Sequence, residues 1–138
     1  MDAVPNDIQH GRNTLSKAER LNRQILIDKL FASGSRAYTI FPLRLVYLEV
    51  SPSETTDVAS VLVSVSKRHF KHAVDRNRIK RQIRESYRRH KHPLISHLQH
   101  QGRAVVFALI YLTNTHTSSD ALEVCVKKLI TRLTEKLT

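Results

Sequence analysis

The sequence predicts a single α+β domain, built as an α/β sandwich in which helices pack against a sheet. The 138 residues are enough for one modest core. Apolar residues at helical spacing alternate along the chain with apolar runs of strand length. The expected order is helix, strand, strand, helix, strand, helix, with room for an extra short strand. This domain covers residues 15–138, and residues 1–14, which are polar and aperiodic, form a disordered N-terminal arm.

The first predicted helix covers residues 22–33. Two starts compete for it, because Ser16 with Glu19 forms a capping box and Asn22 is a simple N-cap. We place the start at Asn22, with the capping box in a separate turn, and Gly34 ends the helix. Apolar side chains repeat at helical spacing and are expected to face the core: Leu26, Ile27, Leu30 and Phe31.

An extended segment is predicted for residues 36–50, and a second strand for residues 58–66. Pro42 cannot donate to a β-ladder and marks the start of regular pairing. Both faces beyond it are largely apolar, with Leu43, Leu45 and Tyr47 on one face and Arg44, Val46 and Leu48 on the other. The strand is therefore expected to be covered on both faces. Residues 51–57 have turn composition, so the two strands are predicted to form an antiparallel hairpin.

A basic helix is predicted over residues 73–90. Between Lys67 and Lys91 lie eleven of the chain's 23 lysines and arginines and only two acids. Apolar residues at four-residue spacing make its core face: Ile79, Ile83 and Tyr87. Cations at the same spacing make a neighbouring face: Arg76, Lys80, Arg84 and Arg88. Such a concentration of positive charge is typical of a surface that binds a polyanion.

Pro93 is expected to end the basic helix, and the following residues form a connector with four histidines: His90, His92, His97 and His100. Histidines can ligate metals, but no Cys, Asp or Glu lies nearby, so we interpret them as solvated. Residues 103–112 are a buried strand, which completes a β-α-β crossover. The last predicted helix begins with a capping box of Asp120 and Glu123. The residues expected on its buried face are Leu122, Val126, Leu129, Ile130, Leu133 and Leu137.

The charge and cysteine content narrow the partner and the compartment. The net charge of +11 and the pI near 10.3 favour nucleic acid as the partner, with an anionic membrane as the second choice. No apolar run is long enough to span a membrane, and the N-terminus has no signal-peptide core. The single cysteine, Cys125, borders the last apolar stripe and is expected to be a small core residue in a reducing cytoplasm.

Two sequence blocks resemble the signature of the bacterial ribonuclease P protein family. Ser64–Lys67 reads SVSK and Ala73–Glu85 reads AVDRNRIKRQIRE, against a family pattern of S-V-(S/A)-K-K followed by A-V-x-R-N-R-I-K-R-x-x-R-E. Arg68 replaces the usual second lysine, and HFKH at residues 69–72 replaces a turn that more often contains glycine. The order of predicted elements extends the resemblance from about Leu15 to Leu137.

The resemblance implies a fold and a function. The general rule for β-α-β units predicts a right-handed crossover, whereas the family implies a left-handed one, as in the second domain of ribosomal protein S5, and we follow the family. It also implies a protein subunit that has no catalytic centre of its own. Such a subunit assists a catalytic RNA subunit, with Mg²⁺, in removing the 5′ leader of precursor tRNA. The implied partners are ribonuclease P RNA and precursor tRNA, without a membrane or an obligate protein partner.

The resemblance also assigns site residues. The RNA-binding residues would be Lys67, Arg68, Arg76, Asn77, Arg78, Lys80, Arg81, Arg84 and Arg88. Among them, Arg76, Asn77 and Arg78, with Lys67, Arg68 and Arg81 nearby, would dock on the RNA subunit. A cleft for the single-stranded leader would comprise Ile27, Phe31, Leu45 and Tyr47, with Lys80 and Arg84 at its edge. The family more often has an aromatic residue at the position of Ile27. Asn77 is the nearest oxygen donor in the motif for a Mg²⁺ ion.

Competing interpretations stay open at this level. The acids are scattered and only three glycines are present, so neither a two-metal nuclease centre nor a glycine-rich phosphate loop is visible. A non-catalytic RNA-binding protein of ribosomal type would show the same charge and fold class. A membrane-surface helix is disfavoured because the basic helix has no wide apolar face. Arg12 in the N-terminal arm and Lys17 just after it are interpreted as solvated rather than RNA-binding.

Overall fold

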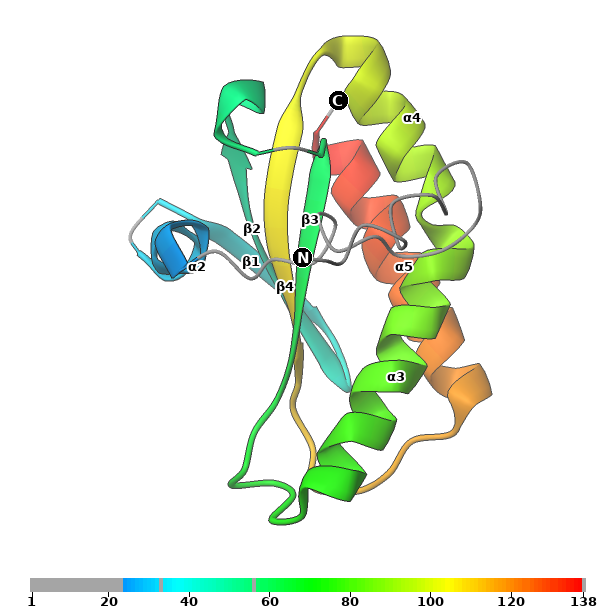
Figure 1. The fold of residues 1–138 in the computed structure, drawn as a ribbon. Helices are drawn as coiled ribbons and strands as arrows, with labels where there is room; N and C mark the ends of the chain where they lie inside the picture. Colours follow the sequence, from blue (N-terminus) through cyan, green and yellow to red (C-terminus); the bar gives the residue numbers. More distant parts are fainter. Residues whose placement is uncertain (1–23, 33, 56, 138) are drawn as a thin grey trace, which may run out of the picture.

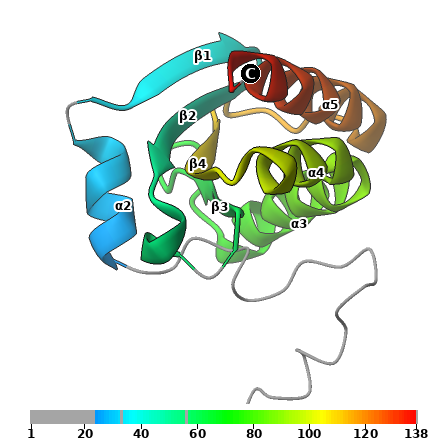
Figure 2. The same ribbon diagram turned by 90° about the horizontal axis from the view of Figure 1, so that it is seen from above.

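The structure, a computed structural model, describes residues 24–32, 34–55 and 57–137. In these ranges the chain forms a four-stranded sheet between two unequal helical layers (Figures 1 and 2). Helix α2 (Gln24–Phe31) covers one face, and α3 (Ala73–His90), α4 (His92–Gln101) and α5 (Ser119–Lys136) cover the other. This is the α+β sandwich that the sequence predicted. The predicted disordered arm at residues 1–14 and the capping-box turn lie outside the described residues.

Helix α2 spans Gln24–Phe31, inside the predicted range of 22–33. Leu26 and Leu30 are buried against the sheet and make a small core with Val46, Val50, Ala104, Val106 and Ala108. Gly34 has φ +104°, a left-handed conformation that glycine adopts without a steric penalty. The chain can therefore turn there from the helix into the sheet.

The extended segment predicted over 36–50 is divided into two strands. Strand β1 spans Arg36–Ile40 and strand β2 spans Leu43–Val50, and they pair antiparallel from Arg36–Tyr47 to Ile40–Leu43. The turn between them is Phe41–Pro42, whose peptide bond is cis. Pro42 does mark the start of a strand, as predicted, and the extra short strand left open by the sequence is β1.

The predicted hairpin between the strands over 43–50 and 58–66 is wrong. Strand β3 spans Ala59–Val65 and strand β4 spans Ala104–Tyr111, and the order across the sheet is β1-β2-β4-β3. Strand β4 is inserted between the other two, antiparallel to β2 and parallel to β3. The physical reason is burial: β4 is apolar along its whole length and buried except at Ile110, so it takes the central position. A short link alone does not determine pairing.

The connection from β3 to β4 is left-handed. In Figure 1 the chain runs down β3, returns upward through α3 (Ala73–His90) and α4 (His92–Gln101), and runs down β4 behind β3. Figure 2, seen from above, shows α3, α4 and α5 on one side of the sheet. The two views together show that β3 lies nearer than β4 to the viewer of Figure 1. In Figure 1 the chain descends through β3, rises through the helices on the right, and descends again through β4 farther from the viewer. This path winds in the left-handed sense. The expectation from the family resemblance is confirmed against the general rule.

The connector predicted after the basic helix is in fact helix α4. Pro93 lies in its first turn, where the missing N–H is not needed, so proline begins this helix as well as following α3. Leu94 and Leu98, four residues apart, are fully buried. Gly102, at φ +65°, ends the helix and donates its N–H to the carbonyl of Gln99.

Helix α5 spans Ser119–Lys136 and packs along α3. All six residues of its predicted stripe are buried: Leu122, Val126, Leu129, Ile130, Leu133 and Leu137. Ser118 is the N-cap and accepts a hydrogen bond from the N–H of Ala121, so the predicted Asp120 capping box does not form. Cys125 is buried, with its Sγ 3.0 Å from the carbonyl oxygen of Ile40, and burial raises the pKa of its thiol. None of the described helices is long and apolar enough to cross a membrane.

Candidate nucleic-acid interface

The core side of α3 sets the orientation of its cations. Ile79, Ile83 and Tyr87 are fully buried, as their spacing predicted. The ring of Tyr87 meets the ring of Phe107 on β4 edge-on, with 5.5 Å between centroids. Because three consecutive turns are anchored in this way, the remaining sides of α3 are turned outward with a fixed rotation.

The predicted RNA-binding residues divide by exposure into two groups. Five are exposed: Lys67, Arg68, Asn77, Arg78 and Arg81. Four are half-buried along the edges of the core stripe: Arg76, Lys80, Arg84 and Arg88. All nine lie on α3 or on the β3–α3 loop (residues 66–72), so the structure does bring them to one region of the molecule.

Arg76 lies at the surface but also forms hydrogen bonds with the protein's own backbone. Its Nη1 donates hydrogen bonds of 2.8 Å to the carbonyl oxygens of both Phe70 and Lys71. These two residues belong to the loop that carries Lys67 and Arg68. The guanidinium therefore ties the loop to the first turn of α3, a role that the sequence motif did not reveal.

Phe70 anchors the same loop and was not singled out in the sequence. Its side chain is 7% exposed and lies between Tyr111 and His116, with ring centroids 6.1 and 5.1 Å away. Ser66 closes the loop from the other end, because its carbonyl accepts the N–H groups of His69 and Phe70 at 3.1 Å. The ring of Phe70 therefore anchors the HFKH segment to the core. An isolated aromatic between cations is the one signal that could have identified it.

Acidic residues on α3 and α5 neutralise part of the positive charge. Glu85 accepts a paired hydrogen bond from Arg88, which lowers the pKa of Glu85 and raises the pKa of Arg88. Glu123 of α5 meets Arg89 at 3.4 Å and His90 at 2.9 Å. Both acids line a groove of about 420 Å³ between α3 and α5, into which Arg78 and Arg81 also face. Of the predicted cations, Arg88 is thus the one most engaged with an acid.

Among the described residues, only α2 packs on its face of the sheet, and it covers part of that face. The helix packs on the end of the face that holds Val46, Val50 and Ala104. Beyond it, a row of cross-strand neighbours runs from Arg44 on β2 through Ile110 on β4 to Ser64 on β3. Arg44 is exposed and the other two are half-buried, as are Ile27, Leu48 and Leu62 at the border with α2. Phe31 lies four residues after Ile27, so it is on the same side of α2, and it is 51% exposed. We call this surface the open face.

The predicted cleft of Ile27, Phe31, Leu45 and Tyr47 is divided by the sheet. Leu45 is 0% exposed and Tyr47 is 6% exposed, both in the core under α3 and α5, whereas Ile27 packs on the opposite face. Successive side chains of a strand point to opposite faces of the sheet. If odd-numbered residues are assigned to the face that the even-numbered ones occupy, every residue is placed on the wrong side. The β2 residues on the side of α2 are Arg44, Val46 and Leu48.

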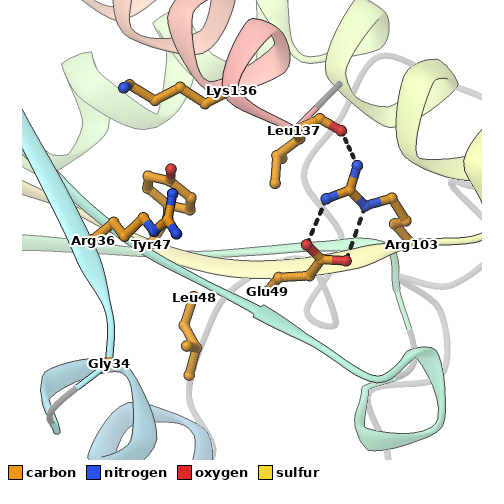
Figure 3. Close-up of a pocket in the computed structure, with 8 residues that line it drawn as sticks. All are labelled: Gly34, Arg36, Tyr47, Leu48, Glu49, Arg103, Lys136 and Leu137. Atoms are coloured by element: carbon orange, nitrogen blue, oxygen red, sulfur yellow. Dashed lines mark hydrogen bonds and ion pairs between the residues drawn. The ribbon is translucent and has the colours of Figure 1, made fainter.

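A pocket of about 280 Å³ lies at the end of the sheet near the C-terminus of α5 (Figure 3). Arg103 forms a two-pronged ion pair with Glu49, at 2.6 and 2.9 Å, and also donates to the carbonyl of Leu137. The bond to Arg103 lowers the pKa of Glu49. Arg103 thus joins β2, β4 and the end of α5, and Arg36 and Lys136 line the same pocket from β1 and α5.

The described residues contain no group of three or more His, Cys, Asp or Glu side chains placed to hold a metal ion. The histidines of the connector are separated: His97 approaches the carbonyl of Leu137 at 3.3 Å and His90 contacts Glu123. Asn77 is exposed on α3 as a single amide donor. The arrangement of exposed cations on α3 and its loop suits the binding of a polyanion.

Comparisons with known proteins agree with this picture. A family model described as Ribonuclease P matches residues 15–134. The ribonuclease P protein component of Porphyromonas gingivalis is 35% identical over 119 residues, which cover 86% of this chain and 85% of the relative. The corresponding protein of Chlorobium phaeobacteroides is 42% identical over 93 residues, which cover 66% of this chain and 62% of the relative.

Solved structures share the fold. The Staphylococcus aureus RNase P protein superposes with a TM-score of 0.67 at 19% identity, covering 85% of this chain and 96% of that one. The RNase P protein of Thermotoga maritima gives a TM-score of 0.61 at 17% identity, covering 83% and 96%. At these identities the likeness concerns the fold.

Proposed function

The chain belongs to the ribonuclease P protein family and is a subunit of ribonuclease P, and on this premise we propose how its surfaces divide the work. The N-terminal half of α3 and the β3–α3 loop dock on the RNA subunit. The open face holds the 5′ leader of precursor tRNA. The catalytic centre lies in the RNA subunit, and the protein acts in the cytoplasm as a cofactor of that RNA.

The observation that carries the docking assignment is the exposure of cations on α3. Arg78 and Arg81 are exposed, and within the described residues neither forms a hydrogen bond or an ion pair with an acid. Guanidinium groups suit phosphate because they present two parallel N–H donors. Lys67 and Arg68, exposed on the loop that Arg76 holds, extend the same surface.

The open face has the composition expected for a single-stranded RNA partner. It combines an exposed aromatic ring at Phe31, half-buried aliphatic side chains at Leu48 and Ile110, and the exposed cation Arg44. Bases stack on rings and aliphatic surface, while a cation meets the backbone phosphates. Lys80 and Arg84 lie on the opposite helical layer, at the edge of the stripe of α3, and are assigned to the border between the two surfaces.

Mg²⁺ is held by RNA in this proposal. A magnesium ion requires six oxygen ligands in near-octahedral arrangement, and the described residues supply only Asn77 in the motif, with no carboxylate cluster. These residues do not fit a protein-held magnesium site. The phosphates of the RNA subunit and the substrate supply the ligands, and Asn77 makes an outer contact.

The deciding experiment is reconstitution with a bacterial ribonuclease P RNA. At low Mg²⁺ the wild-type chain should stimulate cleavage of precursor tRNA at the leader junction. Exchange of Arg78 and Arg81 for Ala should raise the protein concentration needed for half-maximal stimulation at least about tenfold, if each lost charge-assisted contact contributes about 1–3 kcal/mol. Lys127→Ala, an exposed cation on α5, is the control. Absence of stimulation by a folded wild-type chain would refute the proposal.

A further inference from the structure

Strand β1 and helix α5 lie side by side and run antiparallel, with the edge of the sheet beside one flank of the helix (Figure 2). Three contacts give their alignment. The Sγ of Cys125 lies 3.0 Å from the carbonyl of Ile40, the hydroxyl of Tyr38 donates to the carbonyl of Leu129 at 2.6 Å, and Lys136 lines the same pocket as Arg36 (Figure 3). The two elements therefore make one continuous strip of surface.

The strip carries a row of cations. Lys128, Arg132 and Lys136 repeat at four-residue spacing along α5, so they share one side of the helix over about 12 Å. Arg36 stands at the end of the row, at the start of β1. All four side chains are exposed, and within the described residues no ion pair joins any of them to a carboxylate.

The strip keeps most of this charge. Glu135 of α5 also interacts electrostatically with Tyr38, so we count it as an acid of the strip. With four cations and this one acid, the strip has a net charge of +3. Glu123 faces the other way, toward α3, where it contacts Arg89 and His90. The groove lined by Glu85, Glu123, Arg78 and Arg81 lies on the α3 side of α5, and no residue of the strip lines it. The two basic surfaces are therefore on different sides of α5.

Aromatic rings accompany the cations. The ring of Tyr38 lies under both Arg132 and Lys136, each 5.6 Å from its centroid, which holds these two side chains in place. Phe41, at the tip of the β1–β2 hairpin, is 70% exposed, and its carbonyl is 4.0 Å from the Sγ of Cys125. An exposed ring thus stands at one end of the row and Arg36 at the other.

We propose that this strip, Arg36, Tyr38, Phe41, Lys128, Arg132 and Lys136, is a further RNA-binding surface, separate from α3 and from the open face. It holds the phosphate backbone of an RNA segment other than the one docked by α3. Cations in a row suit a backbone, and an exposed aromatic ring at its end suits an unpaired base. RNA is chosen as the polyanion because the protein is a ribonuclease P subunit, and in this respect the inference rests on the proposed function. The protein would then contact this segment in addition to the segment docked by α3 and the leader on the open face.

The test uses matched pairs of lysines. Lys128→Gln with Lys136→Gln removes two charges from the strip, and Lys29→Gln with Lys127→Gln removes two charges from exposed lysines outside it. Lys127 is the direct neighbour of Lys128 but lines a pocket on the other flank of α5, with His90 and Pro93. Melting curves check that both variants are folded.

Affinity for a bacterial ribonuclease P RNA is measured as a function of KCl concentration. If the strip holds two phosphates through these lysines, the slope of log affinity against log salt should fall in magnitude by about 1.4–1.8 in the strip variant, since each phosphate contact contributes about 0.7–0.9. The control pair should retain the wild-type slope. Equal slopes for the strip variant, the control and the wild type would overturn the proposal.

Two further readouts locate the contact. Lys128 and Lys136 should be protected from acylation when RNA is bound, whereas Lys127 on the same helix should stay reactive. Phe41→Ala should weaken binding about fivefold or more without a change in salt slope, because stacking involves no counterion release. Full acylation of both strip lysines in the complex would contradict the proposal.

The outcomes separate this inference from the proposed function. The pair Arg78→Ala and Arg81→Ala reports on α3: if it weakens binding while the strip variant does not, the docking assignment stands and the strip proposal falls. The reverse result would leave the strip as an RNA site and remove the docking assignment. Vesicles that contain phosphatidylserine form the last arm, and loss of vesicle binding with unchanged RNA binding in the strip variant would replace RNA by a membrane surface.

Discussion

At the scale of single residues, the first arginine of the RNR motif acts on its own loop. Arg76 donates two hydrogen bonds of 2.8 Å to the carbonyls of Phe70 and Lys71, whereas Arg78 is exposed. Arg76→Ala should therefore lower the free energy of unfolding by about 1.5–3 kcal/mol, the usual range for charged hydrogen bonds. Arg78→Ala should change it by about 0.5 kcal/mol or less. Denaturant unfolding of both variants measures the difference.

The same pair of variants separates positioning from contact. If Arg76 acts through the loop, the effect of Arg76→Ala on RNA affinity should largely disappear when Lys67 and Arg68 are already Ala, because the loop then has no cations to place. Arg78→Ala should keep its full effect in that background. Additive losses for Arg76 would mean that it meets RNA directly.

Tyr47 is a core residue of this fold. It is 6% exposed and meets Tyr38 edge-on, with 6.2 Å between ring centroids. Tyr47→Ala should cost about 3–5 kcal/mol of unfolding free energy, as for other buried aromatic truncations. Its effect on affinity should be the same for precursor and mature tRNA. If folded Tyr47→Ala protein selectively lost affinity for precursor tRNA, Tyr47 would be part of the leader site.

Phe31 should behave in the opposite way. Its ring is 51% exposed at the end of α2, so Phe31→Ala should change stability little. If a leader base stacks on the ring, the ratio of precursor to mature tRNA affinity should fall by the equivalent of about 1–3 kcal/mol. Affinities of both RNAs for the reconstituted complex give the ratio, and an unchanged ratio would exclude Phe31 from the leader site.

At the scale of elements, the ion pair of Glu49 and Arg103 holds three segments together. Arg103 lies just before β4, Glu49 lies on β2, and the carbonyl of Leu137 at the end of α5 completes the arrangement (Figure 3). The pair is partly exposed, with side-chain exposures of 44% for Glu49 and 28% for Arg103, so its contribution is limited to about 1 kcal/mol.

The pair should make stability depend on pH in the acidic range. Arg103 lowers the pKa of Glu49 below its ordinary value of 4.5, so the folded state binds this proton less readily than the unfolded state. The stabilisation is present above the ordinary value and is lost as the pH falls through the lowered one. Glu49→Gln should therefore reduce the melting temperature by up to about 5 °C at neutral pH.

That difference should vanish in acid, below both pKa values of Glu49, because the wild-type carboxyl is then neutral as well. Melting curves from neutral pH to pH about 2 test this. A difference between wild type and Glu49→Gln that persists unchanged in acid would show that the ion pair is not its cause. Glu54→Gln, at a carboxylate that pairs with Lys29 near α2, is a comparison at a separate position.

At the scale of the whole molecule, the protein should not cleave RNA by itself. Phosphodiester hydrolysis at a metal centre requires clustered ligands, and the described residues contain no suitable cluster of His, Cys, Asp and Glu. RNA-free protein should leave precursor tRNA intact at any Mg²⁺ concentration, while the reconstituted complex cleaves it. Cleavage that persists after nuclease treatment and removal of all RNA would contradict the assignment of catalysis to the RNA subunit.

The features that the sequence determined are local. The apolar spacing of Ile79, Ile83 and Tyr87 was sufficient to place α3 and to orient its cations, because one helical face of this kind has only one way to meet a core. The buried stripe of α5 and the strand character of β3 and β4 followed from the same periodicities. The family itself was identifiable from the SVSK and RNRIKR blocks.

Only the tertiary structure decided which surfaces these elements share. Alternation along β2 placed Tyr47 and Leu48 on opposite faces, but it does not say which face α2 covers. The predicted cleft used the face of Leu45 and Tyr47, and in the structure that face belongs to the core. The insertion of β4 between β2 and β3 depends on long-range pairing, which a short link cannot specify. The loop contacts of Arg76 and the alignment of β1 with α5 likewise join segments distant in sequence. Local periodicity determines what each element can bury, and packing of the whole chain determines what remains exposed to bind RNA.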